Sequence, residues 1–321
     1  MKYVTIPNTE LRVSQICLGS AEFGAGLTSK DAFSLLDAFI AEGGNFIDTA
    51  HVYSDWIPGT KSTSEKFIGQ WLKKSGMRED IIIATKGAHP ELTSMNVSRL
   101  SKDDIEQDVS ESLEYLQIDT IDLYWLHRDD VNIPVGEIID ALNEQVWLGN
   151  IRYFGCSNWT FNRIREALIY ATDKNVDGFV ANQPLWSLAA ADMSQIPDQT
   201  LVSMDEEGLA FHKRTRLAAI PYTSQAKGFF SKVERSGSAG LSEGDRKVYF
   251  SEINKKRLLR VQELAKKYGV GVNEIALSYL LSQPFTTIPV VGSKTTEQLK
   301  SSLKALDVVL TSEQVQYLEV E

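Results

Sequence analysis

The 321-residue sequence contains little cysteine and no long hydrophobic run. Its two cysteines, Cys17 and Cys156, each lie inside an apolar run, so we expect small buried side chains rather than a disulfide framework. No stretch approaches the ~18 consecutive apolar residues of a membrane-spanning helix. No apolar run of the kind found in secretory signals follows Met1. We therefore expect a cytoplasmic protein with no membrane partner.

Basic residues and metal-ligand patterns are also scarce. The chain has 33 Lys and Arg against 43 Asp and Glu, a net charge of -10. This balance argues against nucleic acid as a partner, because counterion release needs a basic surface. The 4 histidines show no paired ligand spacing, so no metal site is expected. The stretch Gly24-Ala25-Gly26 lacks the third glycine of a dinucleotide-binding loop.

Short apolar runs alternate with segments of helical periodicity along the whole chain. The runs are Gln15–Leu18, Phe46–Asp48, Ile81–Thr85, Ile121–Leu126, Ile151–Cys156, Gly178–Ala181, Leu217–Pro221 and Thr287–Val291. Nearly all are continuously apolar, as in parallel strands that are covered on both faces. Such repeats predict βαβ units, and eight of them predict a closed barrel. We expect one α/β domain, a (β/α)8 TIM barrel spanning residues 1–321.

Three segments do not fit the strand–helix repeat. Tyr3–Val13 alternates around a Pro-Asn turn, which predicts an N-terminal hairpin that plugs the bottom of the barrel. Asp55–Lys61 and the Gly-rich Ser231–Asp245 are too polar for the core. Long loops in a compact domain are often functional, so the second segment is a candidate flap at the C-terminal face.

Polar residues follow several of the predicted strands. Asp48 ends the second run, Lys86 follows the third, His127 follows the fourth, and Tyr53 lies in the loop after Asp48. Alone, each has an ordinary structural explanation: a turn cap, a surface aromatic, a solvated charge or a core histidine. Together they fall at the C-terminal strand ends, where barrel enzymes place their active sites. Their convergence predicts a catalytic site.

The sequence resembles the aldo-keto reductase family nearly from end to end. The segments with this resemblance are Asn45–Tyr53, Ala84–Lys86, Leu123–His127, Gly155–Asn158 and Asn182-Gln183. Their order and spacing are specific, although each one alone would be weak. The resemblance implies hydride transfer between a nicotinamide cofactor and a small carbonyl or alcohol, with Asp48, Tyr53, Lys86 and His127 as the catalytic tetrad.

The chemistry of these residue types agrees with that reaction. Reduction of a carbonyl leaves an alkoxide, which must receive a proton. A phenol with a pKa near ~10 is a poor acid unless a cation is close. Lys86 would supply the cation for Tyr53, with Asp48 holding the ammonium group in place. His127 would hydrogen-bond the carbonyl oxygen and orient the substrate.

The resemblance also implies a cofactor site, and NADP(H) is the expected cofactor. Implied cofactor contacts are Ser157, Asn158, Gln183, Trp186, Tyr222, Thr223, Ser224, Gln225, Gly228, Gly292, Ser293, Lys294 and Gln298. Trp186 is expected to stack on the nicotinamide, and Ser293 and Lys294 to bind the 2′-phosphate at a helix N-terminus. Gln298 stands where many members have Arg, and Ser302 where many have Asn, so NAD(H) stays an alternative.

Around the predicted mouth the sequence places aromatic and charged residues. The expected substrate contacts are Trp56, His89, Arg128 and Asp129, with Trp125, Trp159 and Trp186 as further aromatic walls. Flat rings beside charged groups favour a sugar-like substrate, although Trp125 could instead pack inside the barrel. Two other functions stay open: a regulatory cofactor-binding subunit with little activity, and an isomerase or aldolase using Lys86 as a Schiff base. Oligomeric state is not predicted.

Overall fold

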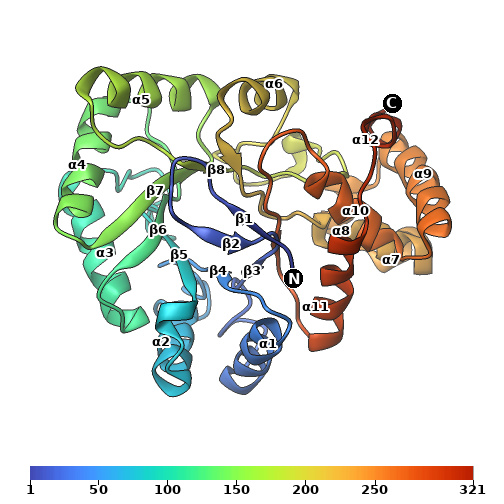
Figure 1. Cartoon of the computed structure of the whole chain (residues 1–321), viewed down its shortest axis with the longest axis horizontal. Helices are drawn as coiled ribbons and strands as arrows, with labels where there is room; N and C mark the ends of the chain where they lie inside the picture. Colours follow the sequence, from blue (N-terminus) through green and yellow to red (C-terminus); the bar gives the residue numbers. More distant parts are fainter. Residues whose placement is uncertain (321) are drawn as a thin grey trace.

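The computed structural model describes residues 1–320 and contains a barrel of parallel strands surrounded by helices (Figure 1). The barrel strands are β3 (Cys17–Gly19), β4 (Phe46–Asp48), β5 (Ile82–Gly87), β6 (Ile121–Leu126), β7 (Ile151–Ser157), β8 (Ala181–Gln183), β9 (Ala218–Ala219) and β10 (Val290–Val291). They are neighbours in chain order, and β10 pairs with β3. A parallel bridge from Ala219 to Thr287 joins the two ends of the sheet. The predicted (β/α)8 barrel is confirmed.

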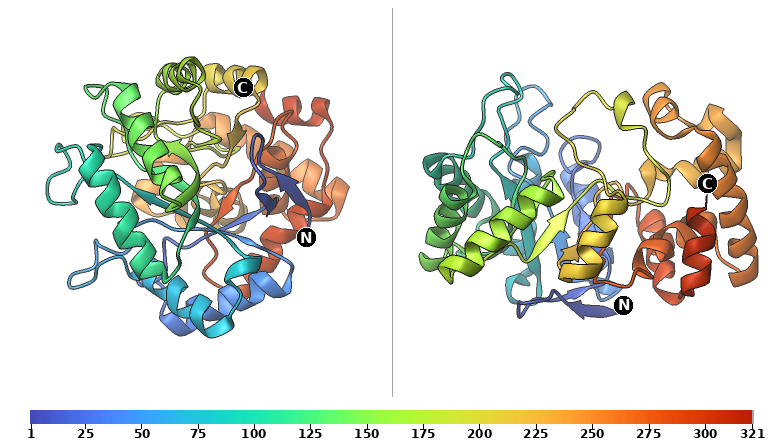
Figure 2. Two further views of the ribbon diagram at one scale, coloured as in Figure 1. Left: turned by 60° about the vertical axis from the view of Figure 1, so that its left-hand side comes forward. Right: turned by 90° about the horizontal axis from the view of Figure 1, so that it is seen from above.

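The predicted N-terminal hairpin is also present, as β1 (Tyr3–Thr5) paired antiparallel with β2 (Arg12–Ser14). Ile6 and Leu11 of its turn are fully buried and belong to the same hydrophobic cluster as Leu123 and Trp125. In Figure 2 the hairpin lies at one end of the barrel, with the loops after β5 and β8 at the other. The hairpin thus closes the N-terminal end, and the C-terminal strand ends are left for a site.

Most of the helices around the barrel begin at side-chain caps, and they bury one apolar face. They are α1 (Ser29–Ala41), α2 (Thr63–Ser75), α3 (Lys102–Leu116), α4 (Val135–Trp147), α5 (Phe161–Lys174), α6 (Glu206–Thr215), α9 (Glu252–Tyr268), α10 (Val272–Leu281), α11 (Thr296–Leu303) and α12 (Ser312–Glu319). The exceptions are α2, α4 and α10, which begin without a side-chain cap. Thr28 caps α1, whose Leu36 and Phe39 are fully buried against the sheet. Ser101 accepts a hydrogen bond from the backbone of Asp104 and so begins α3.

The expectation of a Gly-rich flap over Ser231–Asp245 was wrong, because this segment is largely helical. It contains most of α7 (Phe229–Ser236), a 3₁₀ turn at Gly237–Gly240, and the first residues of α8 (Glu243–Tyr249). Phe229, Phe230 and Tyr249 are buried at the two ends of the segment and anchor it. Its polar residues are therefore the solvated face of short amphipathic helices.

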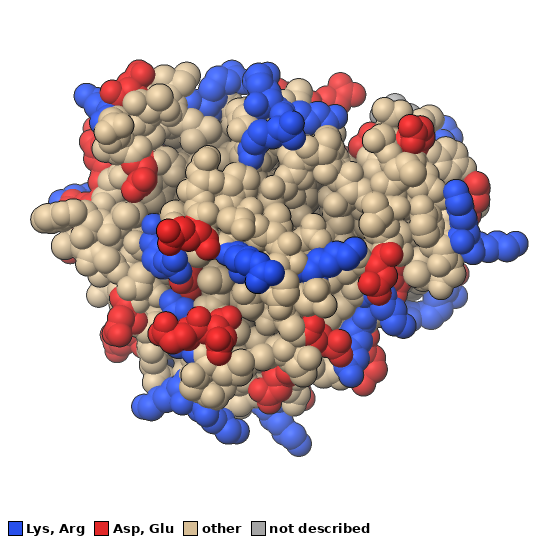
Figure 3. All heavy atoms as spheres, viewed as in Figure 1, with Lys and Arg blue, Asp and Glu red and all other residues tan. Residues whose placement is uncertain are grey.

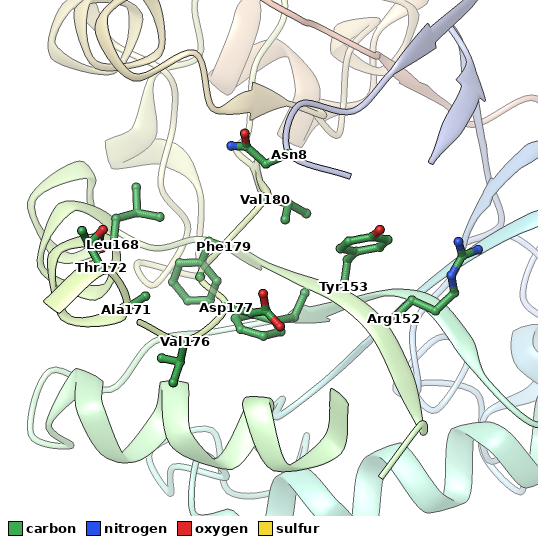
Figure 4. A pocket seen from close by; sticks show the side chains of 12 residues that line it. Asn8, Arg152, Tyr153, Leu168, Ala171, Thr172, Val176, Asp177, Phe179 and Val180 are labelled. Atoms are coloured by element: carbon green, nitrogen blue, oxygen red, sulfur yellow. Dashed lines mark hydrogen bonds between the residues drawn. The ribbon is translucent and has the colours of Figure 1, made fainter. Parts of the chain in front are cut away.

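The outer surface and the hairpin end show no relation to the predicted site. Basic and acidic side chains are interspersed over the face drawn in Figure 3. A cavity of about 250 Å³ lies beside the hairpin turn, lined by Asn8, Tyr153 and Phe179 among others (Figure 4). It includes none of the predicted catalytic or cofactor residues. Within residues 1–320, no helix has both the length and the apolar character needed to cross a bilayer.

Candidate active site

The strand register brings the predicted catalytic side chains into the barrel interior. Side chains two residues apart on a strand face the same side. Ala84 and Leu123 pack in the interior cluster, so Lys86 on β5 and Trp125 on β6 face inward as well. Asp48 is the last residue of β4, next to Ala84 in register. The polar groups thus meet at the C-terminal end of the barrel.

Lys86 lies at the centre of this group. Its ammonium nitrogen donates to Asp48 Oδ2 at 2.5 Å, to the Thr49 carbonyl at 2.6 Å and to the Tyr53 hydroxyl at 3.1 Å. An ammonium group has three N–H donors, so these contacts use all of them. The Tyr53 hydroxyl accepts from Lys86 and donates to none of the described residues. Its proton is therefore available to a substrate.

The second oxygen of Asp48 is held by two further donors. Trp125 Nε1 lies 3.1 Å and Gln183 Nε2 lies 2.9 Å from Oδ1. Asp48, Lys86, Trp125 and Gln183 are each at most 1% exposed. A buried carboxylate with four lone-pair sites is stable only when it is paired and hydrogen-bonded. These contacts fix Asp48, which in turn fixes the ammonium group of Lys86.

Burial and neighbouring charge determine the protonation of Lys86 and Tyr53. Burial opposes the charge on Lys86, but Asp48 and Tyr53 outweigh it, so the pKa of Lys86 is raised above its usual value. Burial also raises the pKa of the Tyr53 phenol, and Lys86 only partly opposes this rise. Lys86 therefore acts on Tyr53 in the expected direction. In this structure, however, its effect is smaller than that of burial.

His127 and His89 form one wall of the site. Their rings meet edge to face, with centroids 4.8 Å apart, and the ring of Tyr53 lies 6.1 Å from that of His127. Burial, with the charge of Arg128, lowers the pKa of His127 well below its ordinary value and that of His89 to about 4. Both imidazoles are thus neutral near pH 7. A neutral His127 keeps one N–H to donate to a carbonyl oxygen.

The residues expected to bind a carboxamide lie next to the catalytic group. Ser157 donates to the Gln183 carbonyl at 2.8 Å. Asn158 donates to the His127 carbonyl at 3.2 Å, and its Oδ1 accepts from the Tyr222 hydroxyl at 2.7 Å. Ser157 and Asn158 at the end of β7, Gln183 at the end of β8, and Tyr222 thus form one polar cluster.

The backbone of Trp186 lies beside this cluster, with its N–H on the Tyr222 carbonyl at 3.3 Å, but its ring packs on other aromatic residues, which does not favour the expected stacking on a nicotinamide. Its ring is 6% exposed, stacks on Phe285 with centroids 6.1 Å apart, and meets Tyr279 edge-on. These contacts make Trp186 part of the second hydrophobic cluster, which packs α9 and α10 against the barrel. Tyr222 is half-buried and is the aromatic residue bound to Asn158.

The expected phosphate contacts lie at the start of α11. Thr295 caps this helix, and the Lys294 backbone N–H donates to Gln298 Oε1 at 2.8 Å. Ser293 is 4% exposed, and its buried hydroxyl has no hydrogen-bond partner among residues 1–320. The ammonium nitrogen of Lys294 lies 3.2 Å from the carboxylate of Glu22, and both side chains are largely exposed.

The loop after β9 contains the other expected cofactor residues. Thr223 and Gly228 have φ angles of 53° and 79°, the left-handed conformation in which successive N–H groups can face an anion. Ser224 donates to the Val290 carbonyl at 2.5 Å, and Gln225 donates to Ser302 at 3.0 Å. These bonds hold the loop against the β10–α11 segment. Gly292 lies on that segment and has open space beside its Cα.

Several of the expected substrate contacts are engaged elsewhere. Asp129 forms an ion pair with Arg163 at 3.3 Å, and both side chains are buried. Trp125 and Trp159 are fully buried, Trp125 against Asp48 and Trp159 with its N–H on the Arg128 carbonyl. Trp125 and Trp159 therefore do not line the mouth, and for Trp125 the alternative of packing inside the barrel is the one observed. Asp129 is engaged with Arg163, and its role in substrate binding stays a prediction. Trp56 is 48% exposed and lies edge-on to Tyr53.

Comparison with known proteins identifies the family. Residues 15–320 match the model of the aldo/keto reductase family. The chain belongs to the aldo/keto reductase family. It is therefore an oxidoreductase, in a family that generally uses nicotinamide cofactors.

Curated relatives are similar over nearly the whole chain. An uncharacterised oxidoreductase, YrpG, of Bacillus subtilis is 30% identical over 98% of this chain and 93% of its own length. An NADP(+) aryl-alcohol dehydrogenase of Phanerodontia chrysosporium is 30% identical over 97% of this chain and 83% of its own length. Norsolorinic acid reductase B of Dothistroma septosporum is 28% identical over 98% and 79%.

A solved structure supports the fold of this aldo/keto reductase. The crystal structure of a thermostable aldo-keto reductase with the inhibitor epalrestat aligns with a TM-score of 0.73. The alignment covers 99% of both chains at 24% identity. At that identity the likeness bears on the fold alone.

Sequence reasoning missed three side-chain contacts of this aldo/keto reductase. Trp125 donates to Asp48, Asp198 pairs with Arg128 at 2.9 Å, and Glu22 pairs with Lys294. Each partner lies far away in the sequence or on an irregular loop, so no local pattern could have joined them. For Trp125 the sequence predicted a place at the mouth or packing inside the barrel, and it gave no sign of the hydrogen bond to Asp48.

Proposed function

We propose that residues 1–321 form one catalytic domain, an NADP(H)-dependent oxidoreductase that interconverts a carbonyl compound and its alcohol, with Tyr53 as general acid and base. One observation supports this most directly: the Lys86 ammonium group bridges Asp48 and Tyr53 at the C-terminal strand ends. A cation next to a phenol whose own proton is free is the arrangement that proton donation to an alkoxide requires.

The residues present fit a nicotinamide dinucleotide. The buried hydroxyl of Ser293, unpaired among the described residues, would gain a partner from a phosphate at the start of α11. Lys294 would add a charge-assisted contact to the 2′-phosphate, which favours NADP(H). Ser157, Asn158 and Gln183 would hold the carboxamide. Tyr222, rather than Trp186, would offer its ring to the nicotinamide, because its hydroxyl is already anchored on Asn158.

The bound cofactor supplies or accepts the hydride. His127 donates its N–H to the substrate carbonyl and orients it beside Tyr53. Tyr53 delivers its proton to the oxygen as negative charge develops there. Lys86 stabilises the resulting phenolate, and Asp48 keeps the ammonium group charged and in place. In the oxidative direction, the same Tyr53 oxygen removes the alcohol proton.

The two alternative functions are less consistent with these contacts. A lysine that forms a Schiff base must lose its proton, which a lowered pKa favours. The pKa of Lys86 is raised, and all three of its N–H groups are occupied. A regulatory subunit without catalysis would not need a phenol whose proton is free beside a fixed cation. Both observations favour an active reductase.

We propose an aromatic carbonyl or aryl alcohol, instead of a sugar, as the substrate class. Asp129 is paired with Arg163, so it is less available to bind sugar hydroxyls. The side chains that remain near Tyr53 include the rings of Trp56, His89 and His127. Flat rings suit a flat substrate. The similarity to an NADP(+) aryl-alcohol dehydrogenase supports the same class and the same cofactor.

The test compares kcat/KM for substituted benzaldehydes with kcat/KM for aldoses of similar size, using NADPH and then NADH. We expect the benzaldehydes to be favoured at least tenfold, and NADPH to be favoured over NADH. A higher kcat/KM for aldoses would contradict the aromatic class and favour a sugar-like substrate. Turnover of neither set would contradict the proposed reaction.

A further inference from the structure

Arg128 has a buried donor that the protein leaves unused. The residue directly follows His127 at the end of β6 and is 8% exposed. Its guanidinium donates to the His127 carbonyl at 2.8 Å and to Asp198 Oδ2 at 2.9 Å. Its Nε is buried and has no hydrogen-bond partner within residues 1–320. More than about 90% of buried polar groups in folded proteins are paired, so this donor requires an explanation.

The guanidinium lies over the reactive side of the site. After burial, its charge is the largest influence on the pKa of His127 and of His89, lowering both. It also partly opposes the rise that burial produces in the pKa of Tyr222. Such effects require short distances, because charge interactions weaken with separation and with water between the groups. The contacts agree with this: the His127 carbonyl that accepts from Arg128 also accepts from Asn158, which in turn is bound by the Tyr222 hydroxyl. The guanidinium therefore lies beside the cluster of His127, Asn158 and Tyr222.

The described groups around Arg128 do not satisfy this donor. Asp198 is fixed by Thr200, whose hydroxyl and backbone N–H both donate to Oδ1, and its Oδ2 is used on Nη2 of Arg128. His89 is turned to the Pro90 carbonyl through Nδ1 at 2.6 Å. Asp129 is paired with Arg163. An unpaired buried donor destabilises the protein, more so when the group is charged, and a substrate oxygen would remove that cost.

We infer that Arg128 binds an acceptor oxygen of the substrate, so that the preferred substrates are aromatic carbonyls that also bear a carboxylate or a similar acidic oxygen. This inference rests on the proposed function, because it concerns the substrate of the same site. Asp198 does not prevent such binding. The Asp198 side chain is 30% exposed, so water weakens its attraction to Arg128. Nε is shielded from water, so an anionic oxygen bound to Nε would interact with the guanidinium more strongly.

The test uses the three carboxybenzaldehyde isomers and their methyl esters, which are uncharged substrates of similar shape. For wild type, the best acid should exceed its ester in kcat/KM by about 10–100-fold, the effect of one hydrogen bond to a charged group. In Arg128→Gln this ratio should fall to within threefold of unity. In Asp198→Asn, which keeps Arg128 and removes the competing carboxylate, the ratio should persist or rise.

The Asp198→Asn variant separates substrate binding from a purely structural role. If Arg128 serves only to hold the 184–203 loop through Asp198, both variants will lower the acid and the ester in parallel, and the inference is wrong. An equal rate for acid and ester in wild type would also overturn it. Thermal melts identify a variant that fails to fold. If Arg128→Gln fails to fold, the acid-to-ester ratios of kcat/KM in wild type and Asp198→Asn test the inference.

Benzoate binding gives a readout that does not depend on turnover. Tryptophan fluorescence is titrated with benzoate and with benzamide at saturating NADP⁺. The dissociation constant should be at least tenfold lower for benzoate than for benzamide in wild type and Asp198→Asn, and this preference should vanish in Arg128→Gln. If no aldehyde is reduced but benzoate still binds through Arg128, the proposed reaction fails and the inference stands. If aldehydes are reduced but benzoate has no preference over benzamide, the inference fails alone.

Discussion

The indole Nε1 of Trp125 donates a hydrogen bond of 3.1 Å to Oδ1 of Asp48 in the barrel interior, where both side chains are buried. The contact turns an apparent packing residue into a support for the catalytic group. Gly155 on the adjacent strand makes room for it, because a Cβ there would lie 2.5 Å from the indole. Trp125 thus acts through Asp48 on the position of Lys86.

Trp125→Phe should destabilise the protein more than Trp159→Phe does. Both tryptophans are fully buried and each donates one hydrogen bond, but Trp125 donates to a carboxylate and Trp159 to a backbone carbonyl. Bonds to charged groups contribute about 1.5–3 kcal/mol, neutral ones about 0.5–1.5 kcal/mol. Urea unfolding should show a difference of about 1 kcal/mol or more. Equal losses would mean that the Asp48 contact adds nothing beyond packing.

Lys294→Ala should weaken NADPH binding by about 10–100-fold and leave NADH binding unchanged, because only NADPH has the 2′-phosphate.

Glu22→Gln should have the opposite effect on NADPH binding. It frees Lys294 from an exposed ion pair, so NADPH should bind more tightly by up to about fivefold. Fluorescence titration measures both. Equal affinity of wild type for the two cofactors would show that Gln298 and Ser302 mark a different preference.

The reductive kcat/KM should be flat from pH 6 to 8. The pKa of His127 lies well below its ordinary value and that of His89 is about 4, both mainly through burial, so neither changes charge in this range. The pKa of Tyr53 is raised above 10, so the phenol stays protonated. A decline in rate should appear only at alkaline pH, where Tyr53 ionises. A break near pH 6.5 would show that a histidine titrates during reduction.

The barrel, and the convergence of the proposed catalytic residues at one end of it, could be predicted from the sequence because both depend on local patterns. Continuous apolar runs located the strands, and the residue that ends or follows a run placed Asp48, Lys86 and His127 at the same end of the barrel. Side-chain partners could not be predicted in the same way. Trp186 and Asp129 lie only a few residues from predicted site residues in the sequence. Their side chains nevertheless contact Phe285 and Arg163, which are distant along the chain.

His212 should make the protein less stable in acid. It is fully buried, and burial lowers its pKa to about 4. Below pH 6.5 the unfolded chain binds a proton that the folded His212 does not, so stability present above pH 6.5 is lost between 6.5 and 4. From pH 7.5 to 5 the loss should be about 2 kcal/mol. His212→Gln should reduce this dependence in urea unfolding. An unchanged dependence would assign the acid sensitivity to other groups.

The Tyr53→Phe variant tests the proposed mechanism most directly, since it removes only the hydroxyl group that Lys86 contacts at 3.1 Å. The measurement is kcat for reduction of a benzaldehyde by the purified variant and by wild type at saturating NADPH. We expect a fall of about 10²–10⁴-fold, the usual contribution of a positioned acid. The dissociation constant of NADPH should stay within twofold, because the phenol faces the substrate. Turnover close to that of wild type would contradict Tyr53 as the proton donor.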